Sequence, residues 1–308
     1  MKQLTQTQVT GSSSDGTRAP ISSGNHQRRS SITWLLSGLL LAALACNVVT
    51  TKVGALQTDT HTIEPADATE VRVTVNMGVG ELNLSGGAES LLQADFSYNV
   101  ADWKPELDYQ VTNNNGRLRV AQPSGNINGI PDDKITNRWT LRFNNEIPLD
   151  MNVTMGVGKS TLDFSELTLT DLQVKTGTGD ITMKIGAQAL DYAGIETGLG
   201  ETNIQFGGGR LDDLNVKMGT GSVLIDLRGT WESNMNATIG GGLGDLTLKL
   251  PRDVGVRVRA NTGLGDVKAN GFRIQDDAYV NDAYGESDVT LDINIDTGVG
   301  TVILELGE

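Results

Sequence analysis

The sequence is poor in the residues that build metal, redox and catalytic centres. Its 308 residues include one cysteine, Cys46, and two histidines, His26 and His61. A single cysteine forms no intramolecular disulfide and no cysteine-based zinc or redox motif. Two histidines that lie outside any repeated segment argue against a histidine-ligated metal and against a catalytic triad. We therefore expect no catalytic residue, no bound metal and no cofactor.

Proline is scarce too, whereas glycine is abundant. The chain has 7 prolines and 38 glycines, and an ordinary chain has about 7% glycine. Collagen is excluded, because it needs glycine at every third position. Many glycines with few prolines are typical of short strands joined by tight turns.

Positive charge is the third shortage. The formal net charge is -14, and four basic residues against one acid give residues 1–45 a net +3, which leaves -17 for the rest. A surface this acidic repels nucleic acid and anionic lipid headgroups, so we expect neither as a direct ligand. Cationic partners and weak binding of Ca²⁺ stay open.

The N-terminal segment carries export signals. Residues 1–30 are rich in polar residues, have no hydrophobic period and predict disorder. Arg28 and Arg29 precede an apolar run over residues 32–45, which is a secretory signal pattern and is short for a membrane span. The run ends in Ala43-Leu-Ala-Cys46, which is similar to a bacterial lipobox and predicts lipidation of Cys46. A single signal-anchor helix is the alternative, and both versions place the remaining chain on the extracytoplasmic face of a bacterial membrane.

A G-x-G tripeptide recurs eight times after the signal segment. Five of the seven successive intervals are 21 or 23 residues long, which predicts a structural repeat of that length. The predicted turn glycines are Gly78, Gly80, Gly156, Gly158, Gly177, Gly179, Gly198, Gly200, Gly219, Gly221, Gly242, Gly244, Gly263, Gly265, Gly298 and Gly300.

The residues on both sides of each glycine pair alternate in polarity. The positions five and seven residues before the second glycine, and four residues after it, are apolar in all eight units. Polar residues mostly separate them, which predicts strand, tight turn and strand with one face buried. A lone unit cannot cover its apolar face, so neighbouring units must stack. We therefore expect an all-β fold, either a β-solenoid or an elongated two-sheet rack, and the pattern leaves both open.

The chain divides into four expected segments. A disordered start with the signal peptide covers residues 1–45, a linker covers 46–62, a hairpin-rich β domain covers 63–150, and the β-repeat covers 151–308. Within the third segment, strand-like runs occupy residues 91–98, 107–111, 117–121 and 139–143. The last repeat interval has 14 extra residues around 276–287, which we expect to form an exposed loop.

Three features imitate functional sites. Residues 156–161, Gly-Val-Gly-Lys-Ser-Thr, match the end of a phosphate-binding loop, but Val153 replaces its first glycine and a strand pattern follows. Acidic residues follow five turns, and we interpret them as solvated turn residues rather than Ca²⁺ ligands. Three tryptophans are interpreted as core residues rather than platforms for sugar rings. The acids are Glu81, Asp180, Glu201, Asp245 and Asp266, and the tryptophans are Trp103, Trp139 and Trp231.

Several segments resemble known bacterial families. Met77-Gly-Val-Gly-Glu-Leu-Asn-Leu and Ala94-Asp-Phe-Ser-Tyr-Asn resemble the N-terminal domain of the toast-rack family. Gly242-Leu-Gly-Asp-Leu-Thr-Leu-Lys-Leu-Pro and Thr262-Gly-Leu-Gly-Asp-Val resemble the putative adhesin domain family and the C-terminal domain of cell-wall-active-antibiotic response proteins. The resemblance covers roughly residues 60–308. It implies a surface-exposed β-rack with no catalytic residue to carry over.

Three hypotheses about function follow. The first is a non-enzymatic, membrane-anchored envelope module that binds a cell-wall polymer or an envelope protein, or that serves as structure. The second is an anchored sensor in an envelope-stress or antibiotic response. The third, a carbohydrate-active enzyme, is the least favoured, because acidic residues recur on most units rather than gathering in one place.

Overall fold

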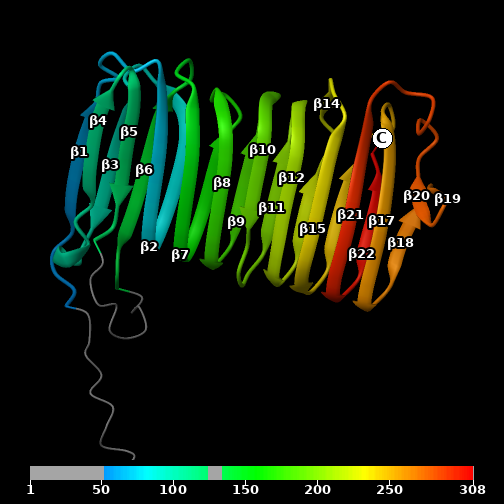
Figure 1. Cartoon of the computed structure of the whole chain (residues 1–308). Helices are drawn as coiled ribbons and strands as arrows, with labels where there is room; N and C mark the ends of the chain where they lie inside the picture. Colours follow the sequence, from blue (N-terminus) through cyan, green and yellow to red (C-terminus); the bar gives the residue numbers. More distant parts are fainter. Residues whose placement is uncertain (1–51, 124–133, 308) are drawn as a thin grey trace, which may run out of the picture. The chain divides into compact units, whose positions relative to one another are not determined.

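The computed structural model describes residues 52–123 and 134–307. Cys46, the predicted signal segment and the whole of the predicted disordered start lie outside these residues. The described part is built almost entirely of strands, with one short 3₁₀ helix, η1 (Ala101–Trp103) (Figure 1). The strands are β1 (Gln57–Ile63), β2 (Glu70–Ala88), β3 (Leu92–Tyr98), β4 (Glu106–Thr112), β5 (Asn115–Ala121), β6 (Asn137–Asn144), β7 (Leu149–Phe164), β8 (Leu169–Thr178), β9 (Ile181–Ile185), β10 (Gln188–Glu196), β11 (Thr202–Phe206), β12 (Gly208–Thr220), β13 (Val223–Asp226), β14 (Thr230–Trp231), β15 (Met235–Leu243), β16 (Leu246–Leu250), β17 (Gly255–Leu264), β18 (Val267–Asn270), β19 (Arg273–Gln275), β20 (Ala278–Val280), β21 (Thr290–Val299) and β22 (Val302–Leu306).

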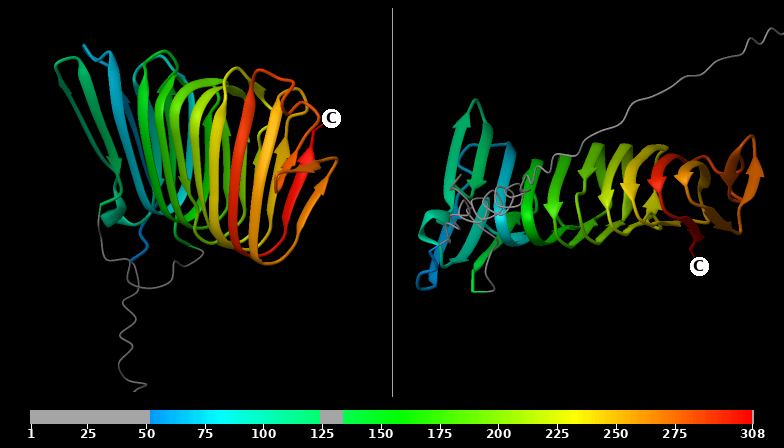
Figure 2. Two further views of the ribbon diagram at one scale, coloured as in Figure 1. Left: turned by 45° about the vertical axis from the view of Figure 1, so that its right-hand side comes forward. Right: turned by 90° about the horizontal axis from the view of Figure 1, so that it is seen from below.

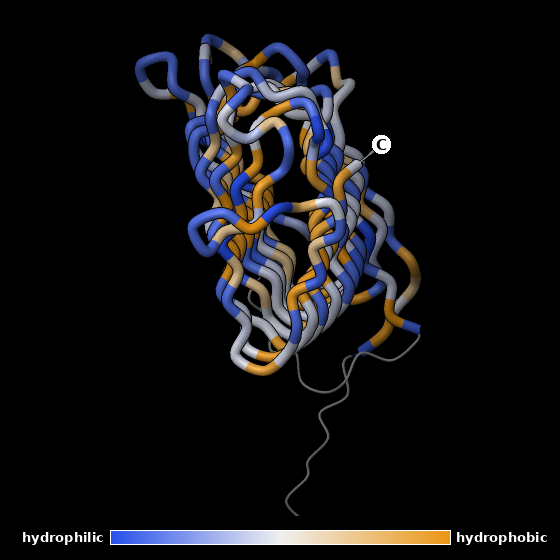
Figure 3. Tube along the Cα trace, turned by 90° about the vertical axis from the view of Figure 1, so that its right-hand side faces the viewer, coloured by the Kyte–Doolittle hydropathy of each residue, from blue (hydrophilic) through white to orange (hydrophobic). Residues whose placement is uncertain are grey.

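Each repeat contributes one strand to each of two facing walls. The strand before the G-x-G turn pairs with its equivalents in the first wall and the strand after it pairs in the second, and the view along the rack shows the two walls facing each other (Figure 3). In β9, Ile181, Met183 and Ile185 are buried, whereas Thr182 and Lys184 are exposed. This alternation follows from the pleat of a strand, which sends successive side chains to opposite faces. The apolar positions of all repeats therefore meet between the walls, and the all-β prediction is confirmed as a two-walled, solenoid-like rack.

Neighbouring coils pair in parallel and in repeat register. From one end to the other, the first wall contains β5, β2, β7, β8, β10, β12, β15, β21 and β17. The second wall contains β6, β2, β7, β9, β11, β13, β16, β22 and β18. Equivalent repeat positions are direct partners, for example Ile204 and Ile225. β2 and β7 continue through their turns and belong to both walls, and the domain boundary expected at residue 150 falls inside β7.

Chain order and spatial order differ at the C-terminal end. β21 lies between β15 and β17 in the first wall, and β22 lies between β16 and β18 in the second (Figure 1). The last coil in sequence is therefore the second-last coil in space. The extra residues before it are not simply an exposed loop, because Ala278, Val280 and Asn281 are buried. They include β20, which pairs antiparallel with β19 and with β17 and so extends the first wall.

Antiparallel strands close the N-terminal end. β4 pairs with β5 in the first wall, while β3 and β1 extend the second wall beyond β6. β1 occupies part of the segment that we expect to be a linker. Trp139 packs edge-on against Phe96 at 5.4 Å between ring centroids, and Trp103 and Trp231 are buried as well. All three tryptophans are therefore core residues, as predicted.

Candidate functional site

The second glycine of every turn combines a positive φ angle with close backbone contact. Its φ lies between +133° at Gly221 and +154° at Gly265. A Cβ atom on Gly179 would also overlap the carbonyl oxygen of Gly158 in the neighbouring coil. A β-branched side chain would therefore be strained by its own backbone and blocked by its neighbour.

The first glycine of most turns lets the backbones of neighbouring coils approach closely. A Cβ atom on Gly177 would overlap the carbonyl oxygen of Gly156, and one on Gly198 would overlap that of Gly177. Of these first glycines, Gly242 also has a positive φ, +94°. The sixteen glycines lie along one edge of the rack, which we call the turn edge (lower edge in Figure 1).

Backbone hydrogen bonds connect one turn to the next. The N–H of Leu199 donates to the carbonyl of Gly177 at 2.7 Å, and the N–H of Gly179 donates to the carbonyl of Leu199 at 2.7 Å. The glycines thus let the sheet continue through the corner. Residues 156–161, which match the end of a phosphate-binding loop, lie inside β7. The next element is the strand β8 rather than a helix, so the segment has no helix N-terminus to bind a phosphate.

A side chain ends the column of turns at the N-terminal end. Gln122 Oε1 accepts the N–H groups of Gly78 at 3.0 Å and Val79 at 3.1 Å. The amide of Asn137 donates to the same oxygen at 3.1 Å and to the carbonyl of Val79 at 2.6 Å. Gln122 supplies the acceptor that another coil would otherwise provide.

Two of the five acids after the turns accept backbone N–H groups of the neighbouring coil. Asp180 accepts the N–H of Glu201 at 3.2 Å, and Asp245 accepts the N–H of Thr301 at 2.9 Å. The row of acids is also interrupted by residues such as Lys159 and Ser222 at the equivalent position. Within residues 52–123 and 134–307, no three metal-binding side chains come together.

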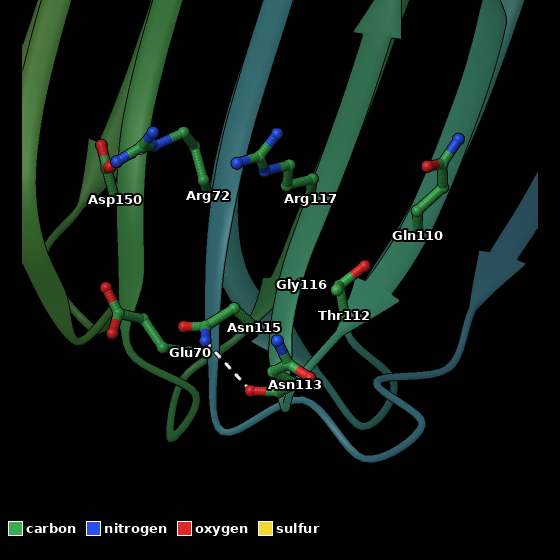
Figure 4. A pocket seen from close by; sticks show the side chains of 9 residues that line it. All are labelled: Glu70, Arg72, Gln110, Thr112, Asn113, Asn115, Gly116, Arg117 and Asp150. Carbon is green, nitrogen blue, oxygen red and sulfur yellow. Dashed lines mark hydrogen bonds and ion pairs between the residues drawn. The ribbon is translucent and has the colours of Figure 1, made fainter.

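A polar hollow of about 450 Å³ lies on the outer face of the first wall, within the size range of small-ligand sites. It spans β4, β5, β2 and β7, near the edge opposite the turns (Figure 4). Strand register brings Gln110, Arg117, Arg72 and Asp150 into one row across the four strands. Below this row, the lining includes Thr112, Asn113, Asn115 and Glu70.

The two arginines of the hollow differ in their partners. Arg72 Nε lies 2.6 Å from Asp150 Oδ2, and this hydrogen bond raises the pKa of the Arg72 guanidinium above its usual value. Arg117 has no acidic partner within ion-pair distance in the part of the chain that the structure describes. Arg72 and Arg117 are direct partners in strand register, and like charges on directly opposed residues repel. An anion placed between them would relieve that repulsion.

Comparison with known proteins identifies the family. The sequence profile of the N-terminal domain of toast-rack, DUF2154, matches residues 52–205 and 193–249. These matches cover more than half of the chain. The chain belongs to the toast-rack family. No protein in the curated set matches it.

Three solved structures are similar to this chain. One, described as a putative cell adhesion protein from Clostridium sporogenes, is 27% identical, covers 82% of this chain and 100% of its own, and has a TM-score of 0.49. A putative adhesin from Bacteroides fragilis is 12% identical, with 81% and 97% covered and a TM-score of 0.33. A putative adhesin from Parabacteroides merdae is 15% identical, with 82% and 96% covered and a TM-score of 0.29.

The sequence analysis did not predict the hollow of this toast-rack chain, although the repeat spacing already implied that Arg72 and Asp150 are neighbours. Arg72 and Asp150 both stand eight residues before the second glycine of their turns. Coils stacked in register must therefore place them side by side. Arg117 lies in the non-repeating part between the first two turns, so the repeat does not place it.

Proposed function

We propose that this toast-rack chain is an exported, non-catalytic binding module of the cell envelope, similar in role to an adhesin, whose hollow binds acidic sugar units of an envelope polymer. The observation that carries the proposal is the pair Arg72 and Arg117 on an otherwise acidic protein. We infer the exported location from the N-terminal signal pattern and from the predicted lipidation of Cys46. Among the described residues, no helix has the length and apolar character needed to cross a membrane.

The chemistry of the hollow fits an anion on a sugar. A guanidinium binds a carboxylate or phosphate through two parallel hydrogen bonds. Around the arginines, the Gln110 and Asn115 amides and the Thr112 hydroxyl can donate to or accept from sugar hydroxyls. The same row carries Asp150, whose carboxylate is engaged by Arg72. This arrangement favours holding a ligand over transferring a proton to it.

The negative net charge does not prevent such binding at physiological salt. Screening reduces interactions between exposed charges beyond about 8 Å at 0.15 M ionic strength. The arginines contact the ligand directly, whereas most acids of the chain lie farther from it. We therefore expect modest affinity that rises when several acidic units of one polymer bind several copies of the protein.

Titration of the full chain with defined polymers tests the proposal. The probes are polygalacturonate, which carries carboxylates, poly(glycerol phosphate), which carries phosphates, and dextran, which is neutral. We expect binding to at least one anionic polymer and none to dextran. Replacing Arg117 by Ala should weaken that binding by about tenfold, the value of one lost charged contact.

Arg119→Ala is the matched control. Arg119 lies two residues further on the same exposed face of β5, but it pairs with Glu106 at 3.5 Å and does not line the hollow. Equal loss in both variants would mean that only general positive charge matters and would contradict the assigned site. Shortening of any polymer during the titration would overturn the non-catalytic part of the proposal.

A further inference from the structure

Exposed aliphatic side chains concentrate on the turn edge. Eight large hydrophobic residues are exposed in the described part of the chain, and seven of them lie on this edge. The eighth, Ile274, is in β19. Five of the seven are the central residues of G-x-G turns, and the other two precede β1. The seven are Val53, Leu56, Val157, Leu199, Leu243, Leu264 and Val299.

The central residues of the turns form a continuous row. Val157 pairs with Thr178, which is followed by Leu199, Thr220, Leu243, Val299 and Leu264, each beside the next. At a strand spacing of about 4.8 Å the row is about 29 Å long. Its C-terminal end is entirely aliphatic, because the inserted coil places Val299 between Leu243 and Leu264. Leu264 is 71% exposed.

The chain also begins its path through the rack at this edge. The N–H of Gly54 donates to the carbonyl of Asn99, and the N–H of Asn99 donates to the carbonyl of Thr136. Asn137, the next residue, touches Gly80 of the first turn. Gly54 is therefore level with the turns, and the left view of Figure 2 shows the start of the described chain, in blue, at the same lower edge.

We propose that the turn edge lies on the surface of the lipid bilayer, with the row of aliphatic side chains in contact with the interfacial region. The inference rests on the anchor that forms part of the proposed function. Nine residues lie between Cys46 and Leu56, and the ten chain steps that join these two residues span at most about 36 Å when fully extended. An anchor at Cys46 or in residues 32–45 is thus joined to the rack at the turn edge and favours that edge as the one nearer the membrane, since the opposite edge lies about 30 Å farther along the strands. It also turns the hollow outwards, where a wall polymer is accessible.

The charges beside the row select the kind of lipid. Asp180, Glu201, Asp245 and Asp266 follow their turns directly, so the edge repels anionic headgroups. Neutral lipid is therefore the preferred surface, and the contact depends on apolar burial rather than on charge. A second copy of the chain could cover the same row and is the competing occupant.

Energy transfer from the protein to the lipid surface tests this orientation. In the full chain, Thr220 of the turn edge or Glu232 near the opposite edge is replaced by an azide-bearing amino acid and coupled to a donor dye. The protein is reconstituted into phosphatidylcholine vesicles that carry acceptor headgroups. β15, nine residues long, spans most of the distance between the edges, about 30 Å. We expect transfer from position 220 to exceed that from position 232 about threefold or more, and to fall when one fifth of the lipid is phosphatidylglycerol.

Variants separate docking from anchoring. Leu243→Ser, Leu264→Ser and Val299→Ser together should reduce transfer from position 220, whereas Ile274→Ser, at an equally exposed aliphatic residue away from the edge, should not. If the protein floats with the vesicles but both positions transfer equally, the docking inference is overturned while the anchor stands. If the protein does not float, both are overturned. If energy is transferred between donor-labelled copies while position 220 transfers little to the lipid headgroups, the row contacts a second copy of the chain. That result would also overturn the inference.

Discussion

The middle coils and the two ends of the rack are stabilised by different kinds of contact. From β8 to β16, chain order equals spatial order, and each turn bonds to the next through backbone groups. At the ends, side chains take over this task. Gln122 completes the first turn, and the buried Asn281 bonds to the backbone of Pro251, Val254 and Val256. The comparison teaches that the repeat propagates the rack, whereas residues outside the repeat pattern end it.

The strongest test of this comparison is Gly179→Val in a middle turn. We expect a loss of more than about 4 kcal/mol in the free energy of unfolding, because Val is strained at φ +136° and overlaps Gly158. Thermal and denaturant unfolding measure it. Gly240→Ala is the matched control, since Gly240 has no positive φ and its added Cβ would meet only one atom, at 3.9 Å. Equal stability of the two variants would contradict the stacked turn.

Core truncations compare the middle with the open end of the second wall. Ile225→Ala removes a fully buried side chain from β13 and should cost about 2–4 kcal/mol. Val267→Ala in β18, which has no partner strand on its outer side in the described residues, should cost about 1 kcal/mol or less. Similar losses would show that the end is as tightly packed as the middle.

Gln122→Ala tests whether a side chain ends the column of turns. The change leaves the N–H groups of Gly78 and Val79 and the Asn137 amide without their common acceptor. We expect a loss of about 2 kcal/mol in unfolding free energy. Gln205→Ala, at an exposed glutamine of the middle coil β11, should change it by less than about 0.5 kcal/mol. A neutral Gln122→Ala would mean that water completes the turn equally well.

The pH dependence of stability tests an ion pair of the middle region. Hydrogen bonds from Arg228 hold the pKa of Asp226 below its usual value. A carboxyl with a lowered folded pKa contributes stability above its unfolded pKa, near 4, and loses it as the pH falls through the folded pKa. Asp226→Asn should therefore cost about 1 kcal/mol at pH 7 and progressively less as the pH falls toward 2. Unfolding curves of both proteins from pH 7 to pH 2 measure this, and parallel curves would exclude the linkage.

The sequence predicted the strands and turns better than it predicted which strands pair with each other. The glycine spacing and the alternating flanks predicted two strands per repeat, because φ limits and the strand pleat act locally. The insertion of β21 between β15 and β17 was not predicted, since strand pairing depends on contacts that no local pattern encodes. The Asn113-Asn114 turn between β4 and β5 has positive φ at both residues, and its sequence did signal a hairpin.

The candidate hollow was predictable only in part. Arg72 and Asp150 share one repeat position, which is enough to pair them once stacking is assumed. Arg117 reaches the same row through β5, which joins β2 from outside the repeat. Such a contact follows from the order of strands at the N-terminal end and not from any spacing in the chain.

Amide hydrogen exchange at the turns tests the central claim, that the turns themselves are stacked like sheet. The N–H groups of Leu199, Thr220 and Gly221 bond to neighbouring turns at 2.7, 2.8 and 2.9 Å. These amides lie at exposed corners, where unbonded groups exchange fastest. The account predicts that they exchange as slowly as the strand amides of β11 and β13, within about tenfold, because one stacking equilibrium opens both. Exchange at the rate of the exposed loop at Asp276 and Asp277 would contradict it.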